Sequence, residues 1–153
     1  MSNDINDLQN LDLSTVPTAL PVLVDGQYEA TVADAKVEPN SKGDGNNFNV
    51  KLTLNLPAKG VIQTPNGLQE TQLNAGFPVF DTISMKETRK DDGSLKYDPR
   101  INLAKFQEGV LGTKGAFFPL EQYIGRRVLI KTKIEKNAEY GDRARVVKYT
   151  YVS

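Results

Sequence analysis

Basic residues recur at regular intervals near the C-terminal end of the chain. Within 126–136, Arg127, Lys131 and Lys133 all stand at odd-numbered positions. Successive side chains of a β-strand point to opposite faces, so these cations would share one face if the segment is extended. Cations two residues apart would lie about 7 Å from each other, close to the distance between successive phosphate groups of an extended polyanion. The pattern therefore indicates a surface that could bind phosphates.

The segment that follows adds arginine and tyrosine side chains. At period two, Arg143, Arg145, Tyr149 and Tyr151 would share one face of a strand. Aromatic rings beside cations suit an unpaired nucleic-acid strand, whose bases can stack on the rings while its backbone contacts the cations. The alternative is an ordinary strand pair, in which the cations keep the outer face in water and the tyrosines complete the core. Spacing alone does not distinguish the two interpretations.

Charge is distributed unevenly along the chain. It carries 19 basic and 19 acidic side chains, and a formal net charge of zero by itself argues against a nucleic-acid partner. Residues 1–25 contain four aspartates and no basic residue, whereas basic residues outnumber acidic ones by eight to three in 123–153. The cations are therefore concentrated in the C-terminal part, where a basic groove could form.

The sequence lacks most of the residue types that enzymes use for catalysis. The chain has no histidine and no cysteine. These absences remove the usual general base at neutral pH, the thiolate nucleophile, disulfides and the commonest ligands of transition metals. The glycine-rich stretch 41–47 lacks the Lys-Ser/Thr pair of a phosphate-binding P-loop. We therefore expect no enzymatic activity, no metal and no cofactor; a nuclease that uses carboxylates and magnesium has no supporting pattern.

The sequence also bears on the compartment of the protein. No apolar run approaches the ~20 residues that span a bilayer, and the N-terminus lacks the basic and apolar regions of a signal peptide. The missing cysteines are typical of a reducing environment. These features predict a cytoplasmic protein without membrane contact.

The chain divides into a short arm and one domain. Residues 1–20 are polar and acidic, with leucines too sparse for a core element, so we expect a flexible arm or a short partner-binding segment. Residues 21–153 are enough for a single domain with one core. In 25–38 the apolar alternation shifts by one position, which indicates a strand that bends at a bulge.

Regular alternation is clearest in 47–56, where Phe48 and every second residue after it are apolar, so a strand is predicted there. The sequence Thr-Pro-Asn-Gly at 64–67 is typical of a hairpin turn. Residues 74–98 show no regular pattern, and a mobile loop is expected over 84–100. Phe80 and Tyr97, which fall within 74–98, are expected to be core residues or loop anchors.

A helix is predicted over 99–111. Asp98 can cap its start, Pro99 fits its first turn and Gly112 can end it. The order is therefore a bent strand, a strand, a hairpin strand, a helix and the two C-terminal strands. This order predicts a mainly β protein: a five-stranded OB-fold-like barrel with one helix between strands 3 and 4. A small α+β sheet with a covering helix is the main alternative.

Two stretches resemble a known family. In the first, a Gly-x-Tyr strand leads to a Lys-Gly-Asp-Gly loop and an amphipathic strand. Its matching residues are Gly26, Tyr28, Lys42, Gly43, Asp44, Gly45 and Phe48. The second stretch, 123–149, has a Gly-Arg-x-Val strand followed by a hairpin rich in arginine and lysine. Both resemble bacteriophage single-stranded-DNA-binding proteins of the OB-fold type.

The resemblance implies a protein that binds single-stranded DNA without sequence preference and protects phage replication or recombination intermediates in the cytoplasm of the bacterial host. Under this interpretation, replication or recombination proteins and further copies of the chain, in a homo-oligomer, are candidate partners. The alternative is a phage structural or assembly protein that uses a small β-barrel for protein contacts.

Under the same interpretation, cations and tyrosines would share the contacts with DNA. The expected phosphate contacts are Lys42, Lys51, Arg127, Lys131, Lys133, Arg143 and Arg145. The residues expected to stack on bases are Tyr140, Tyr149 and Tyr151.

Overall fold

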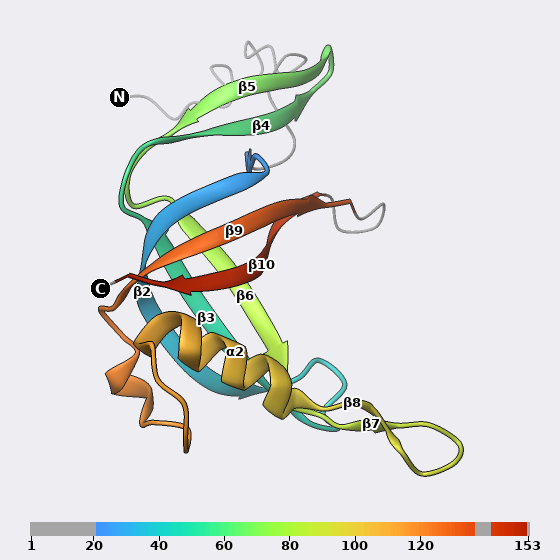
Figure 1. Cartoon of the computed structure of the whole chain (residues 1–153). Helices are drawn as coiled ribbons and strands as arrows, with labels where there is room; N and C mark the ends of the chain where they lie inside the picture. The colour runs from blue at the N-terminus through green and yellow to red at the C-terminus, as the bar shows by residue number, and fades with distance from the viewer. Residues whose placement is uncertain (1–20, 137–141, 153) are drawn as a thin grey trace, which may run out of the picture.

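The computed structural model describes residues 21–136 and 142–152, and these form a mainly β protein with antiparallel sheets (Figure 1). The expected arm at 1–20 lies outside the described residues. The strands are β1 (Val22–Leu23), β2 (Gly26–Pro39), β3 (Asn46–Leu54), β4 (Ala58–Thr64), β5 (Gly67–Leu73), β6 (Pro78–Ser84), β7 (Thr88–Arg89), β8 (Leu95–Tyr97), β9 (Arg127–Glu135) and β10 (Arg143–Tyr151). The helices are α2 (Pro99–Leu111) and the 3-10 turn η1 (Leu120–Gln122).

The largest sheet has five strands in the order β10-β9-β2-β3-β6. Its two edges, β6 and β10, share no ladder of hydrogen bonds in the described part of the chain, so the predicted barrel is not closed by backbone pairing. The helix α2 packs mainly against β10 and also contacts β6 and β9 (Figure 1). It therefore covers the inner face of the sheet near the opening between the edges.

The strand β2 bends at a bulge and pairs with a different strand on each side. Its first part, 26–31, pairs with β9, and its second part pairs with β3 as far as Pro39. The register with β3 shifts between Val32 and Asp34. An extra residue on one strand bends it and increases its twist. The bend predicted from the shift in alternation is therefore confirmed.

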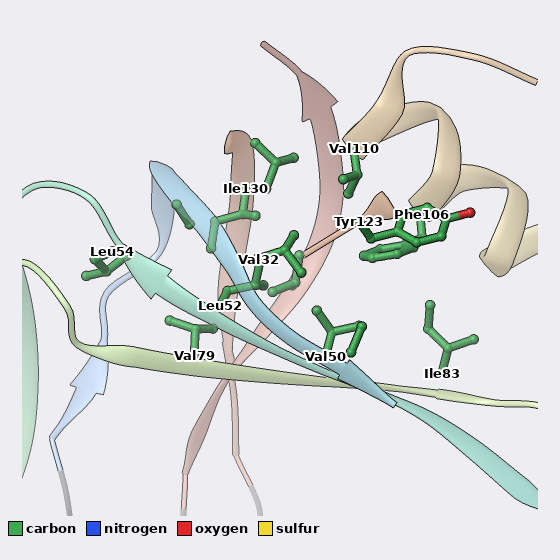
Figure 2. Close-up of a cluster of buried hydrophobic side chains, with 14 of the residues drawn as sticks. Val32, Val50, Leu52, Leu54, Val79, Ile83, Phe106, Val110, Tyr123 and Ile130 are labelled. Atoms are coloured by element: carbon green, nitrogen blue, oxygen red, sulfur yellow. The ribbon is translucent and has the colours of Figure 1, made fainter. Parts of the chain in front are cut away.

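The hydrophobic core lies between the sheet and α2 (Figure 2). The predicted strand at 47–56 is confirmed as β3, and its inward residues from Phe48 to Leu54 are each at most 2% exposed. Leu56 continues the alternation in the sequence but is 63% exposed, because the strand ends at Leu54. From the helix side, Phe106 packs edge-on against Phe48, with ring centroids 5.1 Å apart.

The predicted third strand of the sheet was wrong. The hairpin turn at 64–67 is confirmed, but β4 and β5 pair with β1 in a separate small sheet. The third strand of the large sheet along the chain is β6, which lies in the region where the sequence showed no regular pattern and no strand was predicted. Its inward positions are Val79, Asp81 and Ile83, and the aspartate between two apolar residues hides the alternation. The same region also contains the short hairpin of β7 and β8.

The helix α2 begins and ends where the sequence predicted. The Asp98 side chain accepts a hydrogen bond from the backbone N–H of Arg100, and Pro99 opens the helix. Gly112 ends it with a φ of 71°, in the left-handed region that favours glycine. Within the helix, a Cβ on Gly109 would lie 2.3 Å from the Cβ of Tyr149. Only glycine allows α2 to approach β10 so closely.

Candidate functional site

The outer face of β9 and β10 carries a row of cations, which we call the basic strip. Its members are Lys131, Lys133, Arg143, Arg145 and Lys148, and all five are exposed. The antiparallel register pairs Lys131 directly with Lys148 and Lys133 directly with Arg145. Facing like charges on neighbouring strands repel each other and lower stability. The facing cations therefore do not stabilise the sheet, and they give this face a positive potential.

Two acidic side chains, Glu135 and Asp25, lie beside the strip. Oδ1 of Asp25 accepts a hydrogen bond of 2.7 Å from the backbone N–H of Ile134, next to Lys133. Glu135 contacts the guanidinium groups of Arg143 and Arg145, at 3.0 and 3.6 Å. The three lysines of the strip make no ion pair with any described residue. Because both arginines are well exposed, each of these pairs contributes little to stability and can be exchanged for an external anion. The five cations and the two carboxylates leave a local charge of about +3.

A second bulge changes which side chains of β10 share a face. The register with β9 shifts between Val146 and Lys148. Before the shift, Arg143 and Arg145 point outward; after it, the outward position falls on Lys148. The prediction that Tyr149 and Tyr151 share the face of the arginines was therefore wrong.

Sequence reasoning also missed Lys148 as a member of the strip. A strict period of two from Arg145 reaches position 147, which is a valine, and places Lys148 on the opposite face. The adjacent valines at 146 and 147 break the alternation. That break was the available signal for a bulge.

Tyr149 belongs to the core rather than to a surface for stacking. Its ring meets Phe106 edge-on, with centroids 5.1 Å apart. Its hydroxyl donates a hydrogen bond of 2.5 Å to Oδ2 of Asp81 on β6. This bond joins the two edge strands of the open sheet. Burial, together with the nearby Asp81 carboxylate, raises the pKa of Tyr149 well above its ordinary value, so the hydroxyl stays protonated and can donate.

The other predicted residues of the C-terminal hairpin do not join the strip. Tyr151 is 51% exposed, but its ring lies against Gly112 at the end of α2. Arg127 shares the outer face of β9 with Lys131 and Lys133. It lies at the start of the strand, however, beyond Leu129, where its partner in an ion pair of 3.2 Å is Glu29 on β2. Tyr140 lies outside the described residues. The hairpin therefore contributes cations to the surface but no described ring on which a base could stack freely.

Lys42 and Lys51 lie on a second surface, a hollowed region on the outer face of β2, β3 and β6 that we call the polar trough. One hollow, of about 330 Å³, includes Asp34, Lys36, Glu38, Asn49, Lys51, Phe80 and Thr82 in its lining. A second, of about 300 Å³, is lined by Asn40, Ser41, Lys42, Asp44, Ser84, Lys86 and Thr88. The first hollow is lined by residues of 34–38 and 80–82, and the second by Asn40 and residues of 84–88. They therefore follow one another along the strands.

Phe80 provides an exposed ring in the trough. It is 65% exposed, the highest value for a large apolar side chain among the described residues. The register places Phe80 next to Lys51, and Lys51 next to Asp34, across three strands. Its expected role as a core residue or loop anchor was wrong. Its outward direction follows from its place between the inward Val79 and Asp81, once 78–84 is recognised as a strand.

Opposite charges alternate in the trough. The Lys36 ammonium lies 4.0 Å from Asp34 and 3.8 Å from Glu38. Lys86 donates a hydrogen bond to Asp44, and this bond holds the pKa of the Asp44 carboxyl below its ordinary value. The trough therefore presents charged and hydrogen-bonding groups beside one aromatic ring, with little net charge.

Comparisons with known proteins assign no family to the chain. No protein-family model matches it, and no curated protein matches it. Within 21–136 and 142–152, no helix is both long and apolar enough to cross a membrane. A proposal about function therefore depends on the geometry of the strip and the trough.

Proposed function

We propose that this protein binds single-stranded DNA without strict sequence preference. The observation that carries the proposal is the basic strip, in which cations face each other in register across β9 and β10. The repulsion between opposed cations is relieved when phosphates bind between them. Extended single strands present phosphates at a spacing close to that of alternate strand residues.

The strand order supports an OB-fold-like interpretation. A bulged strand, β2, pairs with both β3 and β9, and α2 comes between β6 and β9 along the chain. Small barrels of this class bind oligonucleotides on the face of their second and third strands and on bordering loops. That face here corresponds to β3 and β6 and therefore to the trough, beside which the strip on β9 and β10 would hold the backbone. In this interpretation, the hydrogen bond between Tyr149 and Asp81 takes the place of a backbone ladder between the edge strands.

In the proposed mechanism, the basic strip and the polar trough bind different parts of the DNA strand. The strip neutralises phosphates, and its contribution weakens as salt increases because counterions are released on binding. The trough provides Phe80, on which a base can stack, with Lys51 beside it. Tyr149 is not retained as a stacking residue. No catalytic step is proposed.

The proposed biological role is protection of phage replication or recombination intermediates in the bacterial cytoplasm, with proteins of those processes as partners. It is supported by the resemblance of 26–48 and 123–149 to phage single-stranded-DNA-binding proteins. The exposed cations of the strip are consistent with this role, since protection of an intermediate requires contact with its backbone rather than with particular bases.

Fluorescence anisotropy tests the proposed activity. A labelled single strand of about 30 nucleotides and its duplex would be titrated with the protein at several salt concentrations. We expect tighter binding of the single strand, with affinity falling linearly on logarithmic axes as salt rises. Equal affinity for the duplex, or no binding at low salt, would contradict the proposal.

A second candidate function is that of a phage structural or assembly protein. Phe117, Phe118 and Ile124, between α2 and β9 along the chain, are between 38% and 43% exposed. Exposed apolar side chains of this kind favour protein contacts when they form a continuous patch. Light scattering of the purified protein over a range of concentrations tests this candidate. Assembly that Phe118→Ser abolishes, without DNA binding, would favour it over the first.

A further inference from the structure

We infer that the polar trough discriminates between bases and favours guanine over thymine. This inference rests on the proposed binding of single-stranded DNA and adds a preference to it. The strip contacts phosphates, which every nucleotide carries, so it cannot distinguish sequences. The trough has groups that could do so: the outward carboxylates of Asp34 and Glu38, two lysines and an exposed aromatic ring on neighbouring strands. The third carboxyl of its lining, Asp81, is bonded to Tyr149.

The trough is poorly suited to phosphates. The side chains of Asp34 and Glu38 are 50% and 45% exposed, and Lys36 is shared between them. Lys36 and Lys51 balance the charges of these two carboxylates, so the trough offers a phosphate no net attraction. A phosphate placed against either carboxylate would be repelled at short range. A base carries no net charge and does not meet this repulsion. A single strand in the trough is therefore expected to turn its bases toward the sheet.

The carboxylates of the trough match the hydrogen-bonding groups of guanine. Ionised carboxylates accept hydrogen bonds and cannot donate them. Guanine has two adjacent donors, N1–H and the N2 amino group, that can both bond to one carboxylate. It also has the acceptors O6 and N7, which lysine recognises. Lys51 stands between Phe80 and Asp34 in register, so a base stacked on the ring has a donor and an acceptor near its edges.

Thymine matches this surface less well. It has one N–H donor between two carbonyl acceptors, so it cannot bond twice to one carboxylate. Its carbonyl oxygens would face Asp34 or Glu38 and be repelled by them. Both bases can stack on Phe80, and stacking is tolerant of sequence. The difference between the bases therefore comes from the carboxylates rather than from the ring.

The test compares two oligonucleotides of about 12 nucleotides, one of thymine only and one with guanine at alternate positions. A lithium buffer keeps guanine quartets from forming. We expect the full-length protein to bind the guanine-containing strand about five- to tenfold more tightly, as for one well-formed pair of hydrogen bonds at an exposed site.

The double substitution Asp34→Asn and Glu38→Gln separates recognition from repulsion. Both replacements keep an oxygen that can accept the existing hydrogen bonds from Ala35 and Asn49. If the carboxylates recognise guanine, the ratio of the two affinities falls toward one, while binding of the thymine strand becomes tighter. If they only repel phosphates, both affinities rise together and the ratio is unchanged, which overturns the inference.

The matched control is Glu70→Gln with Glu121→Gln, which removes two carboxylates outside the trough, on β5 and η1. It should leave the ratio of the two affinities unchanged.

Glu38→Gln alone replaces the double variant of the trough if that variant does not fold. A wild-type protein that binds neither strand would contradict the proposed function itself. Binding of both strands with a ratio near one would contradict only the preference for guanine.

Discussion

At the scale of single residues, Tyr149 stabilises the fold, although its position among the cations of the C-terminal hairpin had predicted a role in stacking on bases. Its hydroxyl bonds to Asp81 across the two edges of the sheet. Tyr149→Phe leaves a mostly buried carboxyl group without this donor, so we expect a loss of about 1 to 3 kcal/mol in the free energy of unfolding. Urea denaturation measures this loss. Tyr151→Phe is the control, and an equal loss in both variants would contradict the role assigned to Tyr149.

A second prediction concerns the pH dependence of stability and depends on the Asp81 carboxyl. Burial raises the pKa of this carboxyl above its ordinary value, although the Tyr149 hydroxyl and nearby arginines act in the opposite direction. Its contribution to stability is therefore complete below its ordinary pKa and is lost as the pH rises through the higher pKa of the folded state. Asp81→Asn should remove this dependence.

The measurement is the free energy of unfolding of Asp81→Asn and of the wild type between about pH 4 and pH 7. Carboxyls with lowered pKa values, such as Asp44 and Asp98, contribute slopes of the opposite sign to both proteins. Only the difference between the two proteins isolates Asp81. We expect the variant to gain relative stability as the pH rises, and a constant difference would contradict the assignment.

At the scale of elements, the contact of α2 with β10 depends on one glycine. In a helix, replacing glycine by alanine normally stabilises by about 1 kcal/mol. At Gly109 the new Cβ would lie 2.3 Å from the Tyr149 Cβ and 2.7 Å from the Tyr149 carbonyl oxygen. We therefore expect Gly109→Ala to destabilise the protein by about 1 to 3 kcal/mol, as overpacking does.

Thermal denaturation followed by circular dichroism measures the effect of Gly109→Ala. Ala104→Gly, at an exposed position of the same helix, is a control for helix propensity and should cost about 1 kcal/mol. An increase in stability for Gly109→Ala would show that the helix can move away from β10 without cost.

The elements that could be predicted from the sequence are those whose signals are local. The amphipathic alternation of β3 and the caps at Asp98 and Gly112 are set by nearby residues, and both predictions were correct. The strand β6 was missed because Asp81 stands at an inward position, where its partner Tyr149 is 68 residues away. No local pattern reveals such a pair.

In the candidate site too, some residues could be predicted from local alternation, whereas others depend on which strands pair. Lys131 and Lys133 follow from alternation alone, and they lie on the predicted face of β9. The bulge in β10 moves Tyr149 inward and brings Lys148 opposite Lys131, which depends on the pairing of two strands. The trough could not be predicted at all, since it needs β6 beside β3.

At the scale of the whole molecule, a formal net charge of zero conceals an uneven distribution of charge. The strip concentrates cations on one strand pair, whereas the trough balances its charges. Affinity for a polyanion depends on local potential more than on net charge, so a neutral protein can still bind DNA. The central claim is therefore that the strip, rather than charge in general, is responsible for binding.

The most direct test of this claim is the salt dependence of single-strand binding by Lys131→Ala/Lys148→Ala. Its charge-matched control is Lys59→Ala/Lys105→Ala, with one change on β4 and one on α2. Each lost phosphate contact reduces the slope of log affinity against log salt by about 0.7, so we predict a reduction of about 1.4 for the strip variant and none for the control. Equal reductions in both variants would contradict the claim.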